Sequence, residues 1–127
     1  MIVRTLAELV GTDRDIVGDR WRSRRLLRRD DGMSHSLHWT EIKAGTHLEL
    51  RYRHHLESNL VVAGEGEVIE LESGAVHELR PGAMYALDKH DHHLLRAKTD
   101  LTLVCVFWPP LQGDERHNAE GGYEPAD

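Results

Sequence analysis

Histidine is the side chain capable of chemistry that stands out in this sequence. The chain holds 10 histidines among 127 residues, and the densest group is the segment Lys89-His90-Asp91-His92-His93. Clustered imidazoles indicate a metal site or a proton-transfer site, although a histidine can also be structural. On an extended segment, Asp91 and His93 point to the same side. Near the C-terminus, Glu115 and His117 add two more groups able to transfer protons.

Strands must position these residues, because apolar side chains recur with a period of two. The clearest case is the segment 101–108, which two prolines follow. One predicted face carries Leu101, Leu103, Cys105 and Phe107, and the other carries Val104 and Val106. A strand that is apolar on both faces is expected to be covered on both, by a second sheet or by a second subunit.

Turn signals divide the rest of the chain into short strands. Residues 60–63 and 67–71 flank Gly64-Glu65-Gly66, so we predict a β-hairpin there, since glycine supplies the positive φ that tight turns need. Ser73-Gly74 and Arg80-Pro81-Gly82 predict two further turns. Turns that recur about every 8–12 residues are typical of all-β sandwiches and barrels. The length fits one domain, so we predict a single all-β domain.

The charge balance argues against some classes of partner. There are 22 acidic and 16 basic residues, giving a net charge of −6, which disfavours binding to nucleic acid or to an anionic membrane surface. Residues 12–29 carry several arginines around Trp21, and we interpret them as a solvated face with one or two side chains pointing inward. The single cysteine, Cys105, cannot form an internal disulfide, and no signal-peptide or membrane-spanning pattern is visible. We therefore expect a cytoplasmic protein.

The spacing of glycines and carboxylates resembles the two sequence motifs of the cupin superfamily. Gly45, Glu57 and Gly64 fall at positions of the first motif, and Gly82 and Tyr85 at positions of the second. The resemblance implies an all-β fold, a cupin-type double-stranded β-barrel (jelly roll) with short flanking helical or irregular segments. A single cupin domain would span residues 1–127, with 111–127 forming a C-terminal tail or lid.

The cupin pattern also implies a metal site, but an altered one. The positions expected for two histidines of the first motif fall in Arg51-Tyr52-Arg53. Glu57 is retained, Tyr85 occupies the last ligand position, and His93 is the candidate replacement. We predict that Glu57, Tyr85 and His93 converge from three neighbouring strands. Oxygen ligands with one imidazole suit Fe(II), with positions left open for substrate.

Over most of its length the sequence resembles the ectoine synthases, a family of cupin enzymes. The most specific shared strings are Tyr85-Ala86-Leu87-Asp88-Lys89-His90-Asp91, Leu95-Arg96-Ala97 and Val104-Cys105-Val106-Phe107. Further shared strings are Met1-Ile2-Val3-Arg4-Thr5-Leu6, Ser23-Arg24-Arg25-Leu26-Leu27, Asp30-Asp31-Gly32-Met33 and Gly64-Glu65-Gly66-Glu67-Val68. Departures from the family pattern occur at Ser34-His35, Trp108 and residues 48–50, all outside the expected ligand set.

The resemblance implies a cyclising dehydration of N4-acetyl-L-2,4-diaminobutanoate to ectoine and water. Fe(II) bound by Glu57, Tyr85 and His93 would act as a Lewis acid on the amide oxygen. Proton transfer is expected from Tyr52, Glu115 and His117, with the acid and base roles left open. Glu115 and His117 can act only if the tail folds over the barrel mouth.

The family resemblance also implies a substrate-binding set. Its members are Trp21, Arg25, Thr40, Tyr52, Asp91 and Phe107. Arg25 suits the substrate carboxylate, because a guanidinium can donate to both oxygens, while Trp21 and Phe107 would exclude water. Strand parity alone predicts that Phe107 is a core residue, and that Thr40 and Tyr52 are ordinary strand residues.

Two other functions stay open at this point. The missing first-motif histidines favour a small-molecule-binding cupin that catalyses nothing, whereas Glu115 and His117 argue against it. An iron-dependent cupin oxygenase would normally use more than one imidazole ligand. Histidines outside the expected site, among them His55 and His90, are expected to be structural or exposed. The doubly apolar strand at 101–108 fits a buried sheet contact, so we expect a homodimer.

Overall fold

Alternating buried and exposed residues run along the strands of the computed structural model, which describes residues 1–112 and 122. Six strands form one antiparallel sheet, in the order β1 (Asp15–Val17), β2 (Trp21–Leu27), β3 (Ser36–Ile42), β10 (Leu101–Trp108), β5 (Leu56–Ala63) and β8 (Met84–Leu87). Four strands form the second, in the order β4 (His47–Leu50), β9 (His93–Ala97), β6 (Gly66–Glu70) and β7 (Val76–Leu79). The helical elements are short, namely α1 (Leu6–Leu9) and a 3₁₀-helix at Arg29–Asp31.

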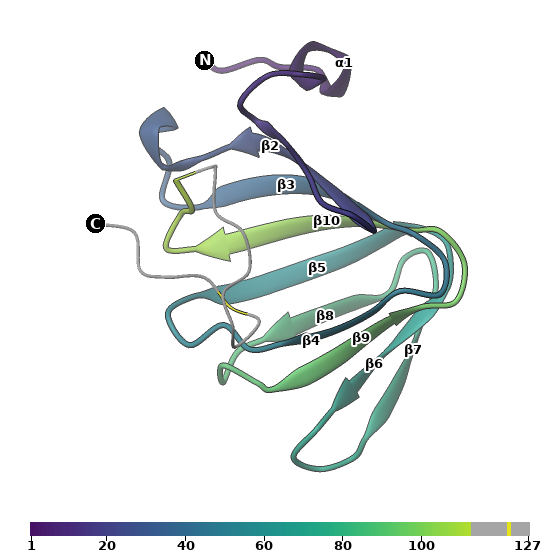
Figure 1. Cartoon of the computed structure of the whole chain (residues 1–127). Coiled ribbons are helices and arrows are strands. Elements are labelled where there is room, and N and C mark those ends of the chain that lie inside the picture. Colours follow the sequence, from purple (N-terminus) through teal and green to yellow (C-terminus); the bar gives the residue numbers. More distant parts are fainter. Residues whose placement is uncertain (113–121, 123–127) are drawn as a thin grey trace.

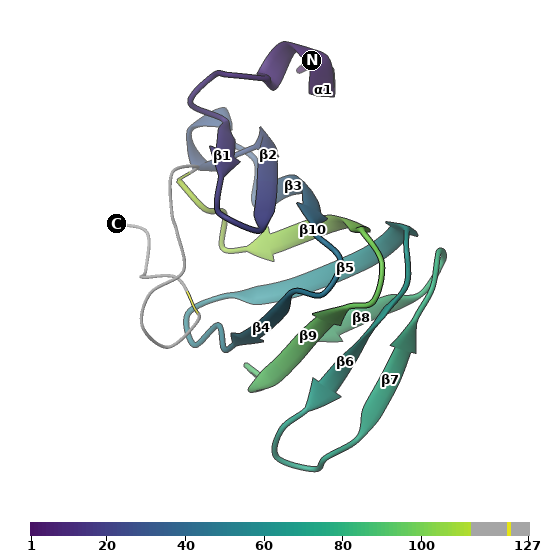
Figure 2. The same ribbon diagram turned by 45° about the vertical axis from the view of Figure 1, so that its right-hand side comes forward.

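The two sheets face each other as in a jelly roll (Figures 1 and 2). Their inner faces enclose one hydrophobic core, which includes Val61, Leu79, Leu101 and Leu103. The predicted all-β cupin fold is confirmed. Within the described residues the two sheets are separate hydrogen-bonded units, so the barrel is closed by side-chain packing and not by a continuous ladder.

β10 lies in the centre of the larger sheet and follows the sequence prediction closely. It ends at Trp108, before the two prolines. Leu101, Leu103, Cys105 and Phe107 are all at most 4% exposed. Val104 and Val106 on the outer face are only half-buried. Among the described residues the second sheet covers the inner face alone, so the predicted cover of the outer face by a second subunit stays a prediction.

The predicted hairpin around Gly64 is wrong, although both of its strands exist. β5 belongs to the six-stranded sheet and β6 to the four-stranded sheet, so the connection crosses from one sheet to the other. A Cβ atom at Gly64 would collide with the carbonyl oxygen of Asp100, and one at Gly66 with that of Arg96. The glycines are therefore needed for close approach to distant backbone, and not for a two-strand turn.

Most arginines of the N-terminal third are neutralised by acidic partners. Arg14 donates two hydrogen bonds to Asp31, both at 2.9 Å, and Arg4 donates a third at 2.7 Å. Hydrogen bonds from these guanidiniums hold the pKa of the Asp31 carboxyl well below its usual range. Arg25 differs from them in pointing inward, with 0% of its surface exposed.

Leu111 and Gly122 are anchored on the body of the protein. The Leu111 amide donates to Ser36 Oγ at 3.1 Å, and its carbonyl accepts from the Arg29 amide at 2.6 Å. Gly122 is buried so closely against the Arg51 carbonyl that an added Cβ atom would overlap it. Glu115 and His117, with the rest of 113–121 and 123–127, lie outside the described residues, so the predicted lid stays a prediction.

The described part of the chain has no helix with the length and apolar character needed to cross a lipid bilayer.

Candidate active site

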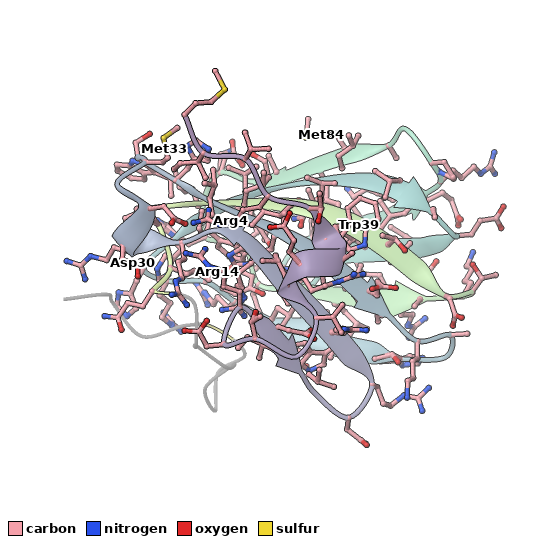
Figure 3. The ribbon with its side chains drawn as sticks, turned by 90° about the horizontal axis from the view of Figure 1, so that it is seen from above. Arg4, Arg14, Asp30, Met33, Trp39 and Met84 are labelled. Carbon is pink, nitrogen blue, oxygen red and sulfur yellow. The ribbon has the colours of Figure 1, made fainter. Side chains whose placement is uncertain are left out.

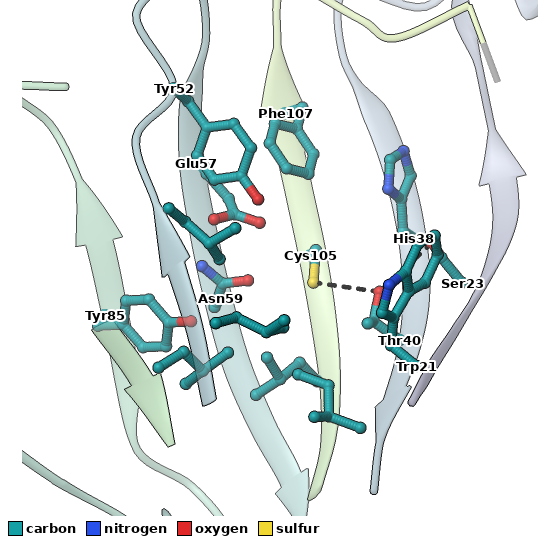
Figure 4. Close-up of a pocket in the computed structure, with 15 residues that line it drawn as sticks. Trp21, Ser23, His38, Thr40, Tyr52, Glu57, Asn59, Tyr85, Cys105 and Phe107 are labelled. Carbon is teal, nitrogen blue, oxygen red and sulfur yellow. Dashed lines mark hydrogen bonds between the residues drawn. The ribbon is translucent and has the colours of Figure 1, made fainter. Parts of the chain in front are cut away.

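A pocket lies between the sheets, against the inner face of the six-stranded one (Figure 4). Its polar lining consists of Ser23, His38, Thr40, Tyr52, Glu57, Asn59, Tyr85 and Cys105. Its apolar lining consists of Trp21, Ile42, Leu48, Leu50, Leu95, Leu103 and Phe107. A concave pocket in which polar groups converge between apolar walls is the usual form of a small-molecule site.

Strand register explains why these polar groups meet. Residues paired across neighbouring antiparallel strands point to the same face of a sheet. One inward-facing row crosses five strands, through the pairs Tyr85–Asn59, Asn59–Cys105, Cys105–His38 and His38–Arg25. The row therefore carries polar side chains from β8 to β2 through what would otherwise be a hydrophobic interior.

The predicted metal ligands come from both sheets. Glu57 on β5 and Tyr85 on β8 lie on adjacent strands and both line the pocket. His93 begins β9, where it pairs with Leu50 in the opposite sheet. Its ring centroid lies 6.4 Å from that of Tyr85. The prediction of three neighbouring strands is wrong in this respect, because the chain crosses between the sheets before β9.

The interior favours uncharged side chains. Burial raises the pKa of the Glu57 carboxyl to about 8, an effect that the nearby side chain of Asn59 partly offsets. No lysine or arginine of the described residues forms an ion pair with Glu57. Burial and the nearby Glu57 raise the pKa of the Tyr85 phenol well above its usual value, and burial also raises that of the Cys105 thiol. An unpaired carboxylate here would be costly, so a cation beside Glu57 would stabilise its ionised form.

His93 has the hydrogen-bonding state of a metal ligand. Its Nδ1 lies 2.9 Å from the carbonyl oxygen of Asp91, and because a carbonyl only accepts, Nδ1 must carry the proton. The lone pair is then on Nε2, a buried atom with no hydrogen-bond partner. Burial lowers the pKa of the imidazole, which keeps it neutral. This is the arrangement by which a backbone carbonyl orients a metal-binding histidine.

The predicted ligand residues therefore fit a metal ion chemically. No group of three or more His, Cys, Asp or Glu side chains in the described part of the chain is placed to hold one. The predicted set contains only two such side chains, Glu57 and His93, with Tyr85 as the third ligand. The Fe(II) prediction thus depends on a tyrosine oxygen.

Four of the predicted substrate-binding residues line the pocket, namely Trp21, Thr40, Tyr52 and Phe107. The Tyr52 ring stands edge-on to Phe107, with centroids 5.1 Å apart. Arg25 lies behind the lining, and its Nε donates to Ser23 Oγ at 3.2 Å.

Asp91 is not brought into this pocket. It lines a separate groove, which Tyr85 and His93 also line, and its carboxylate accepts from the Lys89 amide at 3.4 Å. Glu115 and His117 lie outside the described residues.

His38, Asn59 and Cys105 also line the pocket, although none of them was among the predicted site residues. Burial and the charge of Arg25 lower the pKa of His38 well below its usual value. The Cys105 thiol donates to Thr40 Oγ1 at 3.6 Å. Parity could have found all three, because His38 stands two residues before Thr40, Asn59 two residues after Glu57, and Cys105 two residues before Phe107.

The fold and the site together define a cupin. Solved cupins include an RmlC-like protein from Desulfovibrio desulfuricans, with a TM-score of 0.60 and 22% identity over 72% of this chain and 85% of that one. A cupin barrel protein from Salinispora arenicola has a TM-score of 0.67 and 18% identity, over 85% of this chain and 88% of that one. At these identities the likeness shows the fold alone.

A family model described as ectoine synthase matches residues 1–127, and the chain belongs to that family. The L-ectoine synthase of Shouchella clausii is 51% identical over 97% of this chain and 92% of its own. The L-ectoine synthase of Halalkalibacterium halodurans is 47% identical over 100% of this chain and 98% of its own. The crystal structure of ectoine synthase from P. lautus has a TM-score of 0.88 and 49% identity, over 95% of this chain and 87% of that one.

Proposed function

We propose that this protein is an ectoine-forming hydro-lyase that cyclises N4-acetyl-L-2,4-diaminobutanoate with loss of water. The observation that carries the proposal is the match to the ectoine synthase family over residues 1–127. In this reaction the α-amine nitrogen bonds to the acetamide carbon. The resulting carbinolamine loses its hydroxyl group together with a proton from nitrogen, as water, and a cyclic amidine remains.

Glu57, Tyr85 and His93 would hold Fe(II) in this pocket. A Lewis acid at that position would polarise the amide oxygen and so favour attack at its carbon. Two features of the chain support this set: the buried Glu57 carboxyl without an ion-pair partner among the described residues, and the buried Nε2 of His93. The Asp91 carbonyl contributes by fixing which nitrogen of His93 carries the proton.

Tyr52, Glu115 and His117 are the groups that we assign to proton transfer. The amine must lose a proton as it attacks, and the hydroxyl must gain one as it leaves. Tyr52 is 3% exposed and stands against Phe107 at the pocket wall (Figure 4). The assignment of Glu115 and His117 rests on the family resemblance, because both lie outside the described residues.

Orientation of the substrate is the second contribution of the protein. A flexible substrate must fold back so that its amine meets its own acetamide group, and a site that holds both ends can supply several kcal/mol of the barrier. We assign the substrate carboxylate to Arg25, whose guanidinium is fully buried behind Ser23. Trp21 and Phe107 contribute apolar wall to the pocket, and Thr40 offers a hydroxyl in its lining.

Turnover without oxygen separates this function from its alternatives. Purified protein is loaded anaerobically with Fe(II) and incubated with N4-acetyl-L-2,4-diaminobutanoate, and ectoine is measured by chromatography. Ectoine formation supports the proposal. Binding without turnover would identify a non-catalytic binding cupin, and a requirement for oxygen would identify an oxygenase.

We also propose a homodimer, in which the outer face of the six-stranded sheet packs on a second copy. An apolar row crosses that face through the register pairs Trp39–Val104, Val104–Leu60 and Leu60–Met84. Leu60 is 43% exposed and Met84 64%, and Figure 3 shows Met84 and Trp39 on the outer side of the sheet. Large contiguous apolar patches on a soluble domain usually mark an interface.

Analytical ultracentrifugation tests the dimer. Leu60→Glu is expected to give a monomer, because a charge would be buried in the contact. Val76→Glu is the control, since Val76 is 54% exposed on the other sheet. A monomeric wild-type protein, or a dimer that survives Leu60→Glu, would contradict this interface.

We retain the cytoplasm as the expected location, which suits the free thiol of Cys105.

A further inference from the structure

His90 adopts a backbone conformation that histidine rarely takes. Its φ is +54°, and it is the only non-glycine residue with positive φ within 1–112 and 122. The left-handed region is sterically unfavourable for residues with a Cβ atom, and such residues persist only where surrounding contacts hold them. Strained residues of this kind concentrate at functional sites, so the contacts that hold His90 indicate what it does.

Those contacts join two loops. His90 Nδ1 lies 2.7 Å from the carbonyl oxygen of Tyr52 and 3.2 Å from that of His55. Both partners can only accept, so Nδ1 carries the proton and donates to each. His90 belongs to the loop 88–92 between β8 and β9, and its partners belong to the loop 51–55 between β4 and β5. One side chain therefore ties together segments that are 38 residues apart.

Both loops carry residues of the proposed active site. Tyr52 lies in the first, while Tyr85 and His93 flank the second. The Tyr52 ring is 6.2 Å from that of His93 and 5.1 Å from that of Phe107, measured between centroids. Tyr52 comes two residues after the end of β4, and the hydrogen bond that its carbonyl accepts from His90 restrains its backbone there.

We propose that His90 is a positioning residue, which holds the Tyr52 backbone so that the phenol keeps its place at the wall of the pocket. The inference rests on the proposed function only for the role of Tyr52 in proton transfer. The left-handed backbone of His90 is the conformation that directs Nδ1 at the two carbonyls. A displacement of about 1 Å at a reacting group can cost roughly 100-fold in rate, so a restraint of this kind matters to turnover.

Three substitutions separate the hydrogen bond from the backbone conformation. Asparagine tolerates positive φ, and its amide Nδ2 can occupy the place of Nδ1, so His90→Asn keeps both features. His90→Asp has the same shape but can only accept when ionised, so it opposes the two carbonyls. His90→Gly removes the backbone strain together with the donor.

The experiment compares steady-state kinetics of the iron-loaded wild type and the three variants. We expect His90→Asn to keep kcat within about threefold, and His90→Asp and His90→Gly to lower kcat by about tenfold or more with little change in KM. Circular dichroism checks that each variant is folded. Loss of activity in His90→Asn as large as in His90→Gly, or wild-type kcat in His90→Gly, would overturn the proposal.

A second measurement does not depend on activity. The chain has three tyrosines, so ¹⁹F NMR of protein labelled with 3-fluorotyrosine gives few signals, and a Tyr52→Phe variant assigns one of them. That signal is expected to shift or broaden in His90→Gly and His90→Asp, but not in His90→Asn. An unchanged signal in all variants would overturn the positioning role. Wild-type protein that forms no ectoine would instead count against the proposed function.

Discussion

The Cα atom of Gly18 packs directly against the indole ring of Trp21, with no room for a side chain between them. The Gly18 amide donates to the Trp21 carbonyl at 2.8 Å, and a Cβ atom added at Gly18 would stand only 2.6 Å from the indole Nε1. Trp21 lines the interior pocket and also two outer grooves beside it. Gly18 therefore sets the position of the wall between the pocket and the protein surface.

Gly18→Ala tests the importance of that wall. Alanine is expected to leave the fold intact but to displace the Trp21 ring, and to lower kcat/KM by about tenfold or more, since small misplacements at a site are costly. Trp21→Phe in the same background gives the Cβ atom more room, so the double variant should lose less than the two single variants combined. Strictly additive losses would show that Gly18 does not act through Trp21.

Removal of any one ligand is expected to abolish iron binding. Glu57→Ala, Tyr85→Ala and His93→Ala each delete one member of a three-residue set, and no group of three His, Cys, Asp or Glu side chains among the described residues is placed to hold the ion instead. Iron content after anaerobic loading, measured by atomic absorption, checks the prediction. His92→Ala is the matched control, because His92 Nε2 contacts Glu49 at the surface. Full iron content in all three ligand variants would reject the assignment.

The sequence predicted individual strands better than their connections. β10 could be predicted because its alternation is strong and two prolines follow it. The hairpin at Gly64 could not, because the contacts that decide its path involve Asp100 and Arg96, which are distant in sequence. Nothing local to residues 60–71 distinguishes a turn within a sheet from a crossing between sheets.

Site residues divide in a similar way. Glu57 and Tyr85 could be placed from motif spacing, and both line the pocket. His38 was not predicted as a site residue, because parity with Thr40 gives only the face on which it lies, and its place beside Cys105 and Arg25 depends on the strand register. The link from His90 to Tyr52 depends on one backbone angle and two loops, and neither is encoded in a local pattern.

Deletion of the C-terminal segment is expected to abolish turnover while the barrel stays folded. The cut belongs after Gln112, because Leu111 is fully buried and bonded to Ser36 and Arg29. A cut after Pro110 would also remove that buried leucine, at a cost of about 2–5 kcal/mol in stability. Ectoine formation and thermal unfolding of both truncations separate the two effects. Full activity after the cut at Gln112 would exclude a role for Glu115 and His117.

Glu57 is expected to give the metal-free protein a pH-dependent stability. Its pKa is about 8 in the folded protein, against an ordinary value of 4.5, so the folded state binds a proton that the unfolded state releases. The free energy of unfolding from this group is therefore highest below about pH 4.5 and falls as the pH rises to about 8. Urea unfolding of metal-free protein between pH 5 and 8 should show this decline as a difference between the wild type and Glu57→Gln, which cannot ionise.

Metal binding should reverse the effect, because a cation favours the carboxylate that burial disfavours. At pH 7 the metal-free Glu57 is mostly protonated, so binding must release close to one proton from it. Calorimetry in two buffers with different ionisation enthalpies measures that number, and Glu57→Gln provides the comparison. Binding with no proton release at pH 7, or equal release by the wild type and Glu57→Gln, would show that Glu57 is not a ligand. A release that is larger by about one proton in the wild type than in a Glu57→Gln protein that still binds the ion would tie the raised pKa of Glu57 directly to the metal site.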